Sequence, residues 1–184
     1  MKTFVTGLHR AGTHSIAEHM AADMGLPYIE ESVIGLDSLA IVDKIIKEYK
    51  DGFVCQCPFL AHKVLELAKR GEVYWCKRNK LDVVTSMRNG SFDTFSWKVM
   101  VNFHDEFPDD PIWWTLKYDG SKDVYSGFVN HFALLLRVKE YFFQNYFKDY
   151  VKVMQLEKQP YYNAQTSLSH NKRLKPAEAK GLIL

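Results

Sequence analysis

The amino-acid sequence predicts a three-layer α/β fold with a five-stranded, mostly parallel sheet. Short apolar runs alternate with longer segments of helical periodicity, and Gly or Pro ends most of them. The 184 residues are 47% hydrophobic and 25% charged, which excludes a chain that is disordered, collagen-like or a coiled coil throughout. A chain of this length suits one domain, and we expect residues 1–184 to form one.

The expected elements follow one another in alternating order. Strands are predicted at 3–6, 28–29, 53–57, 73–76 and 151–156. Helices are predicted at 13–24, 37–49, 60–69, 81–87 and 128–150. In the first helix, Ile16, Ala17, Met20 and Met24 share one face, and Gly25 provides a C-terminal stop. The tail after Pro160 is polar and weakly patterned.

Residues 90–127 break this pattern, and we expect an irregular insertion or lid there. Turn-forming pairs such as Asn89-Gly90 punctuate the segment. It also holds Trp97, Trp113 and Trp114. A Trp-Trp pair is more often part of a core, although aromatic faces also suit sugars, phenols and hydrophobic alcohols.

Charge and apolar pattern exclude several partners. The 24 Lys and Arg against 22 Asp and Glu leave a net charge of +2, which gives no polyelectrolyte basis for nucleic-acid binding. No run approaches the ~20 apolar residues that span a bilayer, and the N-terminal run is too short for a signal peptide. Cys55, Cys57 and Cys76 indicate reduced, buried thiols in a cytoplasmic protein. The Cys55-Gln56-Cys57 pair could form part of a metal site, but no second pair of ligands follows it at the spacing of zinc sites, so we expect no metal site.

A glycine-rich loop follows the first strand. Residues 7–13 read Gly-Leu-His-Arg-Ala-Gly-Thr, which is Gly-x-x-x-x-Gly-Thr between a strand and a helix. Glycines allow backbone N–H groups to turn toward an anion, and the helix start adds its positive dipole end, which predicts a phosphate site. The alternative is a tight turn without a ligand. Thr13 stands where a nucleoside triphosphatase has its lysine.

A second candidate anion site follows the fourth predicted strand. Arg78 stands at the strand end, and Ser86 comes eight residues later on the inward side of the next helix. A guanidinium and a hydroxyl there can converge on a second phosphate. The alternative is a solvated basic turn.

Together these segments resemble the P-loop sulfotransferases. The stretch GLHRAGTHSIAEHM is similar to their 5′-phosphosulfate loop, and YWCKRNKLDVVTSMRNG to their 3′-phosphate motif. The resemblance covers roughly residues 3–90, and VMQLEKQP at 153–160 weakly echoes the last strand of the family. It implies a P-loop nucleoside-triphosphate-hydrolase-like fold. It also implies metal-free transfer of a sulfuryl group from 3′-phosphoadenosine 5′-phosphosulfate (PAPS) to an acceptor hydroxyl.

The resemblance also implies roles for individual residues. The 5′-phosphate site would comprise Arg10, Ala11, Gly12, Thr13, His14 and Ser15, and the 3′-phosphate site Arg78 and Ser86. Tyrosylprotein sulfotransferases carry Glu-Glu-Thr after the loop, and the matching Glu31 lies 21 residues after Arg10. Glu31 is therefore the expected base, Glu30 the fallback and Arg10 the catalytic cation. A solvated turn is the alternative for this acidic pair.

The sequence departs from the family at several positions. Gln56 replaces a lysine that often assists the leaving group, and Lys63 or His14 is the candidate substitute. His62 is the nearby candidate for the histidine base of cytosolic members. Residues 79–82 lack the family's proline. The later Gly-rich loop is not evident, and residues 171–173 are the candidate replacement.

Two other functions remain open. A small-molecule or nucleotide kinase with a degenerate P-loop would bind ATP with magnesium. A non-catalytic nucleotide-binding module on the same fold would bind 3′-phosphoadenosine 5′-phosphate (PAP) without transferring sulfate. For the sulfotransferase we expect a small-molecule, carbohydrate or peptide hydroxyl acceptor and no nucleic-acid or membrane partner. The acidic pairs at 105–106 and 109–110 disfavour a highly anionic acceptor.

Overall fold

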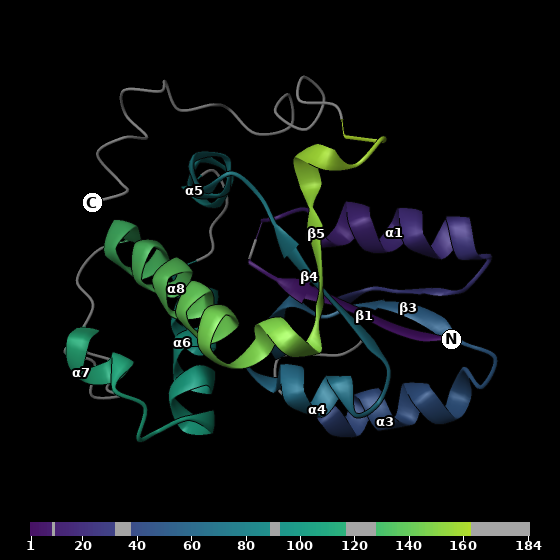
Figure 1. Cartoon of the computed structure of the whole chain (residues 1–184), viewed down its shortest axis with the longest axis horizontal. Helices are drawn as coiled ribbons and strands as arrows, with labels where there is room; N and C mark the ends of the chain where they lie inside the picture. The colour runs from purple at the N-terminus through teal and green to yellow at the C-terminus, as the bar shows by residue number, and fades with distance from the viewer. Residues whose placement is uncertain (9, 32–37, 89–92, 117–127, 163–184) are drawn as a thin grey trace.

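Five parallel strands form one sheet in the order β2-β3-β1-β4-β5 (Figure 1). The computed structural model describes residues 1–8, 10–31, 38–88, 93–116 and 128–162. The strands are β1 (Lys2–Gly7), β2 (Tyr28–Ile29), β3 (Phe53–Gln56), β4 (Glu72–Lys77) and β5 (Lys152–Gln155). The predicted α/β architecture with five strands is confirmed, and the sheet is parallel throughout.

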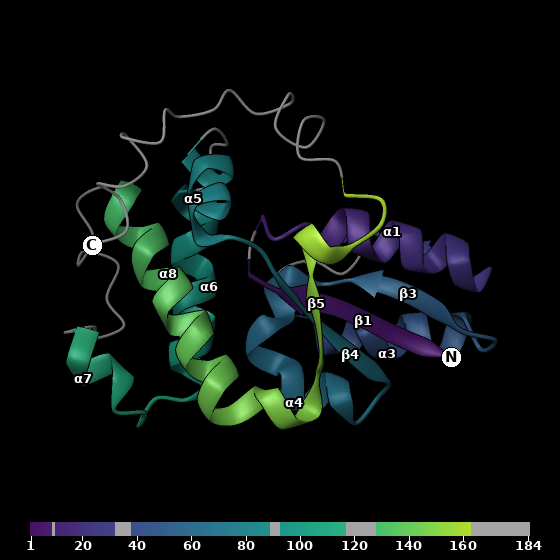
Figure 2. The same cartoon turned by 45° about the horizontal axis from the view of Figure 1, so that its top comes forward.

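Helices cover both faces of the sheet. They are α1 (Thr13–Met24), α3 (Leu39–Glu48), α4 (Val64–Ala68), α5 (Lys80–Arg88), α6 (Asp93–Glu106), α7 (Ile112–Leu116) and α8 (Phe128–Phe142). Helix α1 lies on one face, and α3 and α4 lie on the other (Figures 1 and 2). Helices α5, α6 and α8 lie together beyond the carboxyl ends of the strands (Figure 2).

Strand β1 lies at the centre of the sheet, and its side chains are buried on both faces, those of Thr3 and Thr6 included. Phe4 and Val5 are fully buried, and Phe4 pairs with Cys55 on β3 and with Val73 on β4. Strands that are buried on both faces are typical of parallel sheets that are covered on both sides. The central strand therefore delivers the loop that follows it to the middle of one edge of the sheet.

Helix α1 has the predicted bounds and ends where glycine was expected. Gly25 adopts a left-handed conformation with φ of 64°, and Leu26 N–H donates to the Ala21 oxygen at 2.9 Å. Met24, on the same face as Met20, is nevertheless 36% exposed, whereas Met20 is buried. Met24 stands in the last turn, directly before the chain leaves the helix at Gly25.

The prediction of an irregular insertion is wrong for the parts of 90–127 that the structure describes. Helix α6 forms because Val99, Met100 and Phe103 recur at helical spacing, and all three are buried. Trp113, in the short helix α7, is also buried, and its indole N–H donates to the Phe107 oxygen at 2.6 Å. Its neighbour Trp114 is 80% exposed. The side chain of Trp97 lies outside the described part.

Two other predicted helices are broken into shorter pieces. The segment expected at 60–69 begins as the 3-10 helix η1 (Pro58–Lys63) and continues as α4. The segment expected at 128–150 passes from α8 into the π-helical turn η3 (Phe143–Phe147) and the 3-10 turn η4 (Lys148–Tyr150). A π turn brings residues five apart toward one face, and it buries Phe142 and Phe147 with ring centroids 6.2 Å apart.

The three cysteines are free and buried, as predicted. None of the helices in the described ranges is long and apolar enough to cross a membrane. After β5 the chain forms the short 3-10 turn η5 (Leu156–Lys158), which returns to the start of α1. Leu156 is buried there, and its methyl carbons occupy the space that a side chain on Gly12 would need.

Candidate functional site

The connections of two neighbouring strands, β1 and β4, leave the sheet in opposite directions. The chain leaves β1 toward β2 at one edge and leaves β4 toward β5 at the other. Open parallel sheets bind their ligands at such a switch point, outside the carboxyl ends of the strands. The glycine loop and Arg78 directly follow these two strands. The topology therefore brings together the two segments predicted to bind anions.

The glycine loop starts at a position that only glycine can occupy. Gly7 has φ of 126°, and a Cβ there would lie 2.5 Å from the Cys76 oxygen. The next residue, Leu8, donates its N–H to the same oxygen at 3.3 Å. The loop is therefore seated against the end of β4. Farther along, Arg10 has φ of 60° and Gly12 has φ of 81°.

The start of α1 has amide groups available for an anion. The first helical hydrogen bond in the described residues runs from Ile16 N–H to the Gly12 oxygen at 2.9 Å. Helix α1 has no capping side chain and no acidic residue in its first turn. Amides at an uncapped helix start carry partial positive charge and favour an anion. The Ala11 N–H, in contrast, donates to the Leu8 oxygen at 3.2 Å within the loop.

Arg10, Arg78 and Ser86 meet at the switch point. Arg10 Nε donates to Ser86 Oγ at 2.8 Å, across 76 residues of sequence. Arg78 Nη1 donates to the main-chain oxygen of Arg10 at 3.2 Å. The structure thus joins Arg10 of the first predicted anion site to both side chains of the second, through its side chain to Ser86 and through its main chain to Arg78. Serine on α5 is brought inward as predicted, and it is buried.

Two cations share this small region with little solvent. Arg78 is 8% exposed, and its Nε and Nη2 atoms are buried without a hydrogen-bond partner in the part of the chain that the structure describes. Burial lowers the pKa of Arg10, and the charge of Arg78 lowers it further. Unsatisfied buried guanidinium N–H groups beside a second cation favour an anionic ligand at this position.

Asn79 begins the helix that carries Ser86. Its side-chain oxygen accepts from Leu81 N–H at 2.9 Å, and its own N–H donates to Glu157 Oε1 at 2.7 Å. Asn79 therefore caps the start of α5. The missing proline does not prevent the turn that places Arg78 and Ser86 together.

Gln56, at the end of β3, links the expected base to the glycine loop. Its amide nitrogen donates to Glu31 Oε2 at 3.2 Å and to Thr13 Oγ1 at 3.3 Å. Because Thr13 Oγ1 accepts from Gln56, its own hydroxyl hydrogen can be donated to a ligand. Gln56 thus lies between the carboxylate of Glu31 and the hydroxyl group of Thr13 in the glycine loop.

Tyr28 and His14 extend this network. Tyr28 donates its hydroxyl hydrogen to Gln56 Oε1 at 2.8 Å, and the hydroxyl oxygen of Tyr28 lies 2.8 Å from His14 Nδ1. A phenol has one hydrogen to donate, so His14 is the donor in the second contact. Tyr28 therefore fixes the amide of Gln56 with its nitrogen toward Glu31.

The Glu31 carboxyl group is half-buried and close to other charges. Burial raises its pKa, and the neighbouring Glu30 raises it further, while His14, Arg10 and Lys139 act in the opposite direction. A carboxylate with a raised pKa is a stronger base than an exposed one. Glu31 is therefore suited to accept a proton from a hydroxyl group.

Lys139 is a site residue that the sequence analysis missed. It is fully buried on α8, and its Nζ donates to the Gly7 oxygen at 2.8 Å and to the Pro58 oxygen at 3.3 Å. The sequence did hold a signal: Leu135, Val138 and Phe142 are buried, and Lys139 falls on the same apolar stripe. A lysine at such a position is far from the usual solvated one.

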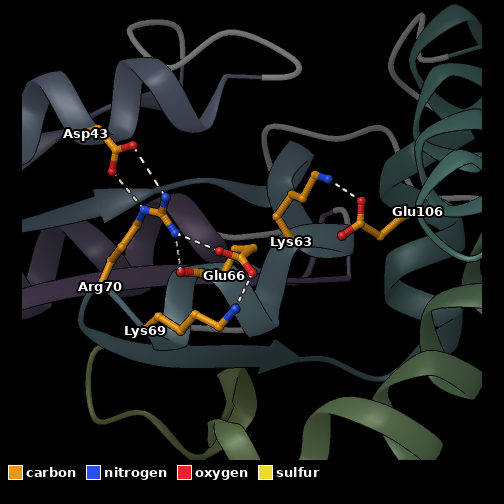
Figure 3. Close-up of polar contacts among 6 residues, drawn as sticks. All are labelled: Asp43, Lys63, Glu66, Lys69, Arg70 and Glu106. Carbon is orange, nitrogen blue, oxygen red and sulfur yellow. Dashed lines mark hydrogen bonds and ion pairs between the residues drawn. The ribbon is translucent and has the colours of Figure 1, made fainter.

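Lys63 lies away from this network. It pairs with Glu106 on α6, as Figure 3 shows. The same figure shows Arg70 held by Asp43 on α3 and by Glu66 on α4, with Arg70 Nε 2.8 Å from Asp43 Oδ1. The Arg70 contacts tie α3 to α4, and the Lys63 contact ties η1 to α6. None of them includes a residue of the two anion sites.

His62 does not have the properties of a base. It is buried beside Phe103, with ring centroids 6.0 Å apart, and burial together with Lys63 and Lys139 lowers its pKa to about 3. An imidazole of this kind is neutral at pH 7 and a weak proton acceptor. Residues 171–173 lie outside the described part.

A cavity of about 420 Å³ lies between α4, the end of α6 and η4, with His62, Glu106 and Tyr150 among its lining residues. None of the residues predicted to bind the nucleotide lines it. Within the described ranges, no group of three or more His, Cys, Asp or Glu side chains could hold a metal ion.

Comparison with known protein families finds no family that matches the chain, and comparison with curated proteins finds no matching sequence.

Proposed function

We propose that this protein is a PAPS-dependent sulfotransferase with a P-loop fold. The observation that carries the proposal is the meeting of Arg10, Arg78 and Ser86 at the switch point between β1 and β4. One ligand with anionic groups at both ends of a ribose could contact both segments at once. A nucleoside 3′,5′-bisphosphate has this chemistry, and PAP is the product that such an enzyme releases.

In this proposal, each phosphate has its own set of donors. The amides of Gly12, Thr13 and His14 bind the 5′-phosphate, with the Thr13 and Ser15 hydroxyls and Arg10 beside them. Arg78 and Ser86 bind the 3′-phosphate. The buried N–H groups of Arg78 that have no acceptor among the described residues support this assignment.

Glu31 is the proposed base for the acceptor. The acceptor oxygen attacks sulfur and forms the new O–S bond while the bond between sulfur and the 5′-phosphate oxygen breaks. The hydroxyl proton passes to Glu31, and PAP leaves with the bonding electrons. Two observations support this role. The raised pKa of Glu31 makes its carboxylate a stronger base, and the hydrogen bond from Gln56 holds that carboxylate in place.

The cation content of the loop favours sulfuryl over phosphoryl transfer. A sulfuryl group carries less negative charge than a phosphoryl group, so amides with one or two cations can stabilise the leaving phosphate. Thr13 replaces the lysine of nucleoside triphosphatases, and Arg10 is the cation within the loop. A kinase would need further positive charge at the γ-phosphate.

The experiment measures binding and transfer separately. The thermal midpoint of the protein is recorded with PAP and with magnesium-ATP, and sulfate transfer from ³⁵S-labelled PAPS is measured over phenols, sugars and tyrosine peptides. We expect stabilisation by PAP, and transfer that Glu31→Gln abolishes while leaving PAP binding intact. Stabilisation by magnesium-ATP alone would indicate the kinase. PAP binding without transfer to any acceptor would indicate the non-catalytic module.

A further inference from the structure

Lys139 contacts the start of the glycine loop and the segment that follows β3. Its Nζ donates to Gly7, where β1 becomes the glycine loop, and to Pro58, directly after β3 and Cys57. In sequence the first of these contacts spans 132 residues. Helix α8 therefore reaches the nucleotide loop with one polar side chain in an otherwise apolar face.

The Gly7 contact fixes the first peptide unit of the loop. The carbonyl of this unit points to Lys139 at 2.8 Å, and its N–H, on Leu8, points to the Cys76 oxygen at 3.3 Å. A peptide unit is planar, so holding both of its polar ends fixes its rotation. The backbone that leads to Gly12 and Thr13 thus starts from a defined orientation.

The Pro58 contact acts on the other side of the same site. Pro58 follows the strand that ends with Gln56, whose amide holds Glu31 and Thr13. One lysine therefore ties the end of β1, which carries the loop, to the end of β3, where Gln56 contacts the expected base. Charge adds to this arrangement, because Glu31 favours the protonated form of Lys139 and Lys139 favours the ionised form of Glu31.

A fully buried lysine is costly, and proteins retain one only where its amino group is well hydrogen-bonded. An apolar residue at position 139 would complete the stripe of α8 at no such cost. We propose that Lys139 is a positioning residue of the active site, which holds the glycine loop in the geometry that binds the 5′-phosphate. This inference rests on the proposed function, and it assigns Lys139 no direct contact with substrate.

The test compares three nucleotides that differ only in their phosphates. Dissociation constants of PAP, adenosine 5′-phosphate and adenosine 3′-phosphate are measured by calorimetry for the wild type, Lys139→Met and Lys139→Gln. Val138→Ala is the matched control, because it weakens the adjacent buried position of α8 without a polar contact to the loop. Far-UV circular dichroism establishes that each variant is folded.

We expect Lys139→Met to weaken PAP and adenosine 5′-phosphate by about 10-fold or more, since small misplacements of binding groups are costly. Adenosine 3′-phosphate, which lacks the 5′ group, should change less than threefold. Lys139→Gln keeps an N–H donor and should recover part of the loss, and it carries the comparison if the methionine variant does not fold. Val138→Ala should lower the thermal midpoint and leave all three affinities unchanged.

Equal losses for the 5′- and 3′-monophosphates would overturn the positioning role, and so would unchanged affinities in Lys139→Met. Loss in Lys139→Gln as large as in Lys139→Met would also contradict it, because the donated hydrogen bonds would then be irrelevant. A wild-type protein that binds none of the three nucleotides would instead contradict the proposed function. The two failures are therefore distinguishable.

Discussion

The guanidinium of Arg78 donates a hydrogen bond to the main-chain oxygen of Arg10 at 3.2 Å, although 68 residues separate them. This contact joins the loop after β1 to the turn after β4. It also holds two cations close together where burial lowers the pKa of Arg10. An anion placed here would relieve their repulsion and satisfy the remaining Arg78 N–H groups.

Replacement of Arg78 by alanine should weaken PAP selectively. Hydrogen bonds to charged groups contribute ~1.5–3 kcal/mol each, so we expect roughly a 10- to 100-fold increase in the Kd of PAP. Adenosine 5′-phosphosulfate lacks the 3′-phosphate and should change little. Calorimetric titration of both nucleotides measures the difference. Arg70→Ala, which breaks the ties to Asp43 and Glu66 far from the loop, is the control and should alter neither affinity. Equal losses for both nucleotides in Arg78→Ala would place the 3′-phosphate elsewhere.

Replacement of Gln56 by leucine should reduce transfer more than binding. Leucine removes the amide that holds Glu31 and Thr13, and it leaves the hydroxyl of Tyr28 without its acceptor. We expect the rate of transfer from PAPS to fall by roughly 10-fold, because a general base contributes only at a fixed position. The Kd of PAP should rise by no more than about threefold, because Gln56 itself is not among the proposed phosphate ligands. Tyr28→Phe should give an intermediate rate, and an unchanged rate in Gln56→Leu would contradict the role of the amide.

Alanine at Gly7 should destabilise the protein far more than alanine at Gly25. Both glycines have positive φ, but a Cβ at position 7 meets the backbone of Cys76 at 2.5 Å, whereas position 25 has open space. Strain from the left-handed conformation costs ~1 kcal/mol in Gly25→Ala. In Gly7→Ala the clash must move the backbone, and we expect a loss of at least ~3 kcal/mol in the free energy of unfolding together with loss of PAP binding. Urea denaturation measures both variants, and similar losses would show that β1 and β4 separate easily.

The stability of the protein should depend on pH through Lys139. Burial lowers its pKa from 10.5 to about 7 in the folded state, and Glu31 partly opposes this shift. Among the described residues, the charge of Glu31 after β2 acts on Lys139, while the nearby His62 on η1 is neutral at this pH. Between pH 7 and about 10 the unfolded chain binds more protons, so the free energy of unfolding rises with pH, by at most ~1.4 kcal/mol per unit. Below pH 7 the full cost of burying the charge is present.

Lys139→Met removes this titrating group. Urea denaturation from pH 6.5 to 9.5 should therefore show a rise in the wild type that the methionine variant lacks. The titration of Glu31 changes the free energy of unfolding in the opposite direction, because a raised carboxyl pKa favours the folded state at low pH. This change takes place at lower pH than that of Lys139. Parallel curves for wild type and Lys139→Met would mean that Lys139 has an ordinary pKa in the folded protein.

The sequence was sufficient for elements whose boundaries depend on local signals. Helix α1 lies between Gly12 and Gly25 as expected, and the five strands coincide with the apolar runs. Helix α6 was missed because the turn pairs that flank it outweighed the helical spacing of Val99 and Phe103. Its stability comes from packing on α8 and η1, which no local pattern records.

In the candidate site, too, some features could be predicted from the sequence and others could not. The proximity of Arg10 and Arg78 could be predicted, because parallel strands place their carboxyl ends at one edge of the sheet and each residue follows such an end. The hydrogen bonds of Gln56 and Tyr28 could not, since they depend on the approach of β2 and β3 in space. Lys139 was overlooked because its partners are main-chain oxygens, which leave no trace in the sequence.

A crystal structure of the protein with PAP tests the central claim most directly. We predict one nucleotide that contacts both segments, with its 5′-phosphate on the amides of Gly12, Thr13 and His14 and its 3′-phosphate on Arg78 and Ser86. The Glu31 carboxylate should face the 5′-phosphate across a gap that is large enough for one sulfuryl group. A nucleotide bound away from these residues, or held by one phosphate with the other in solvent, would contradict the account.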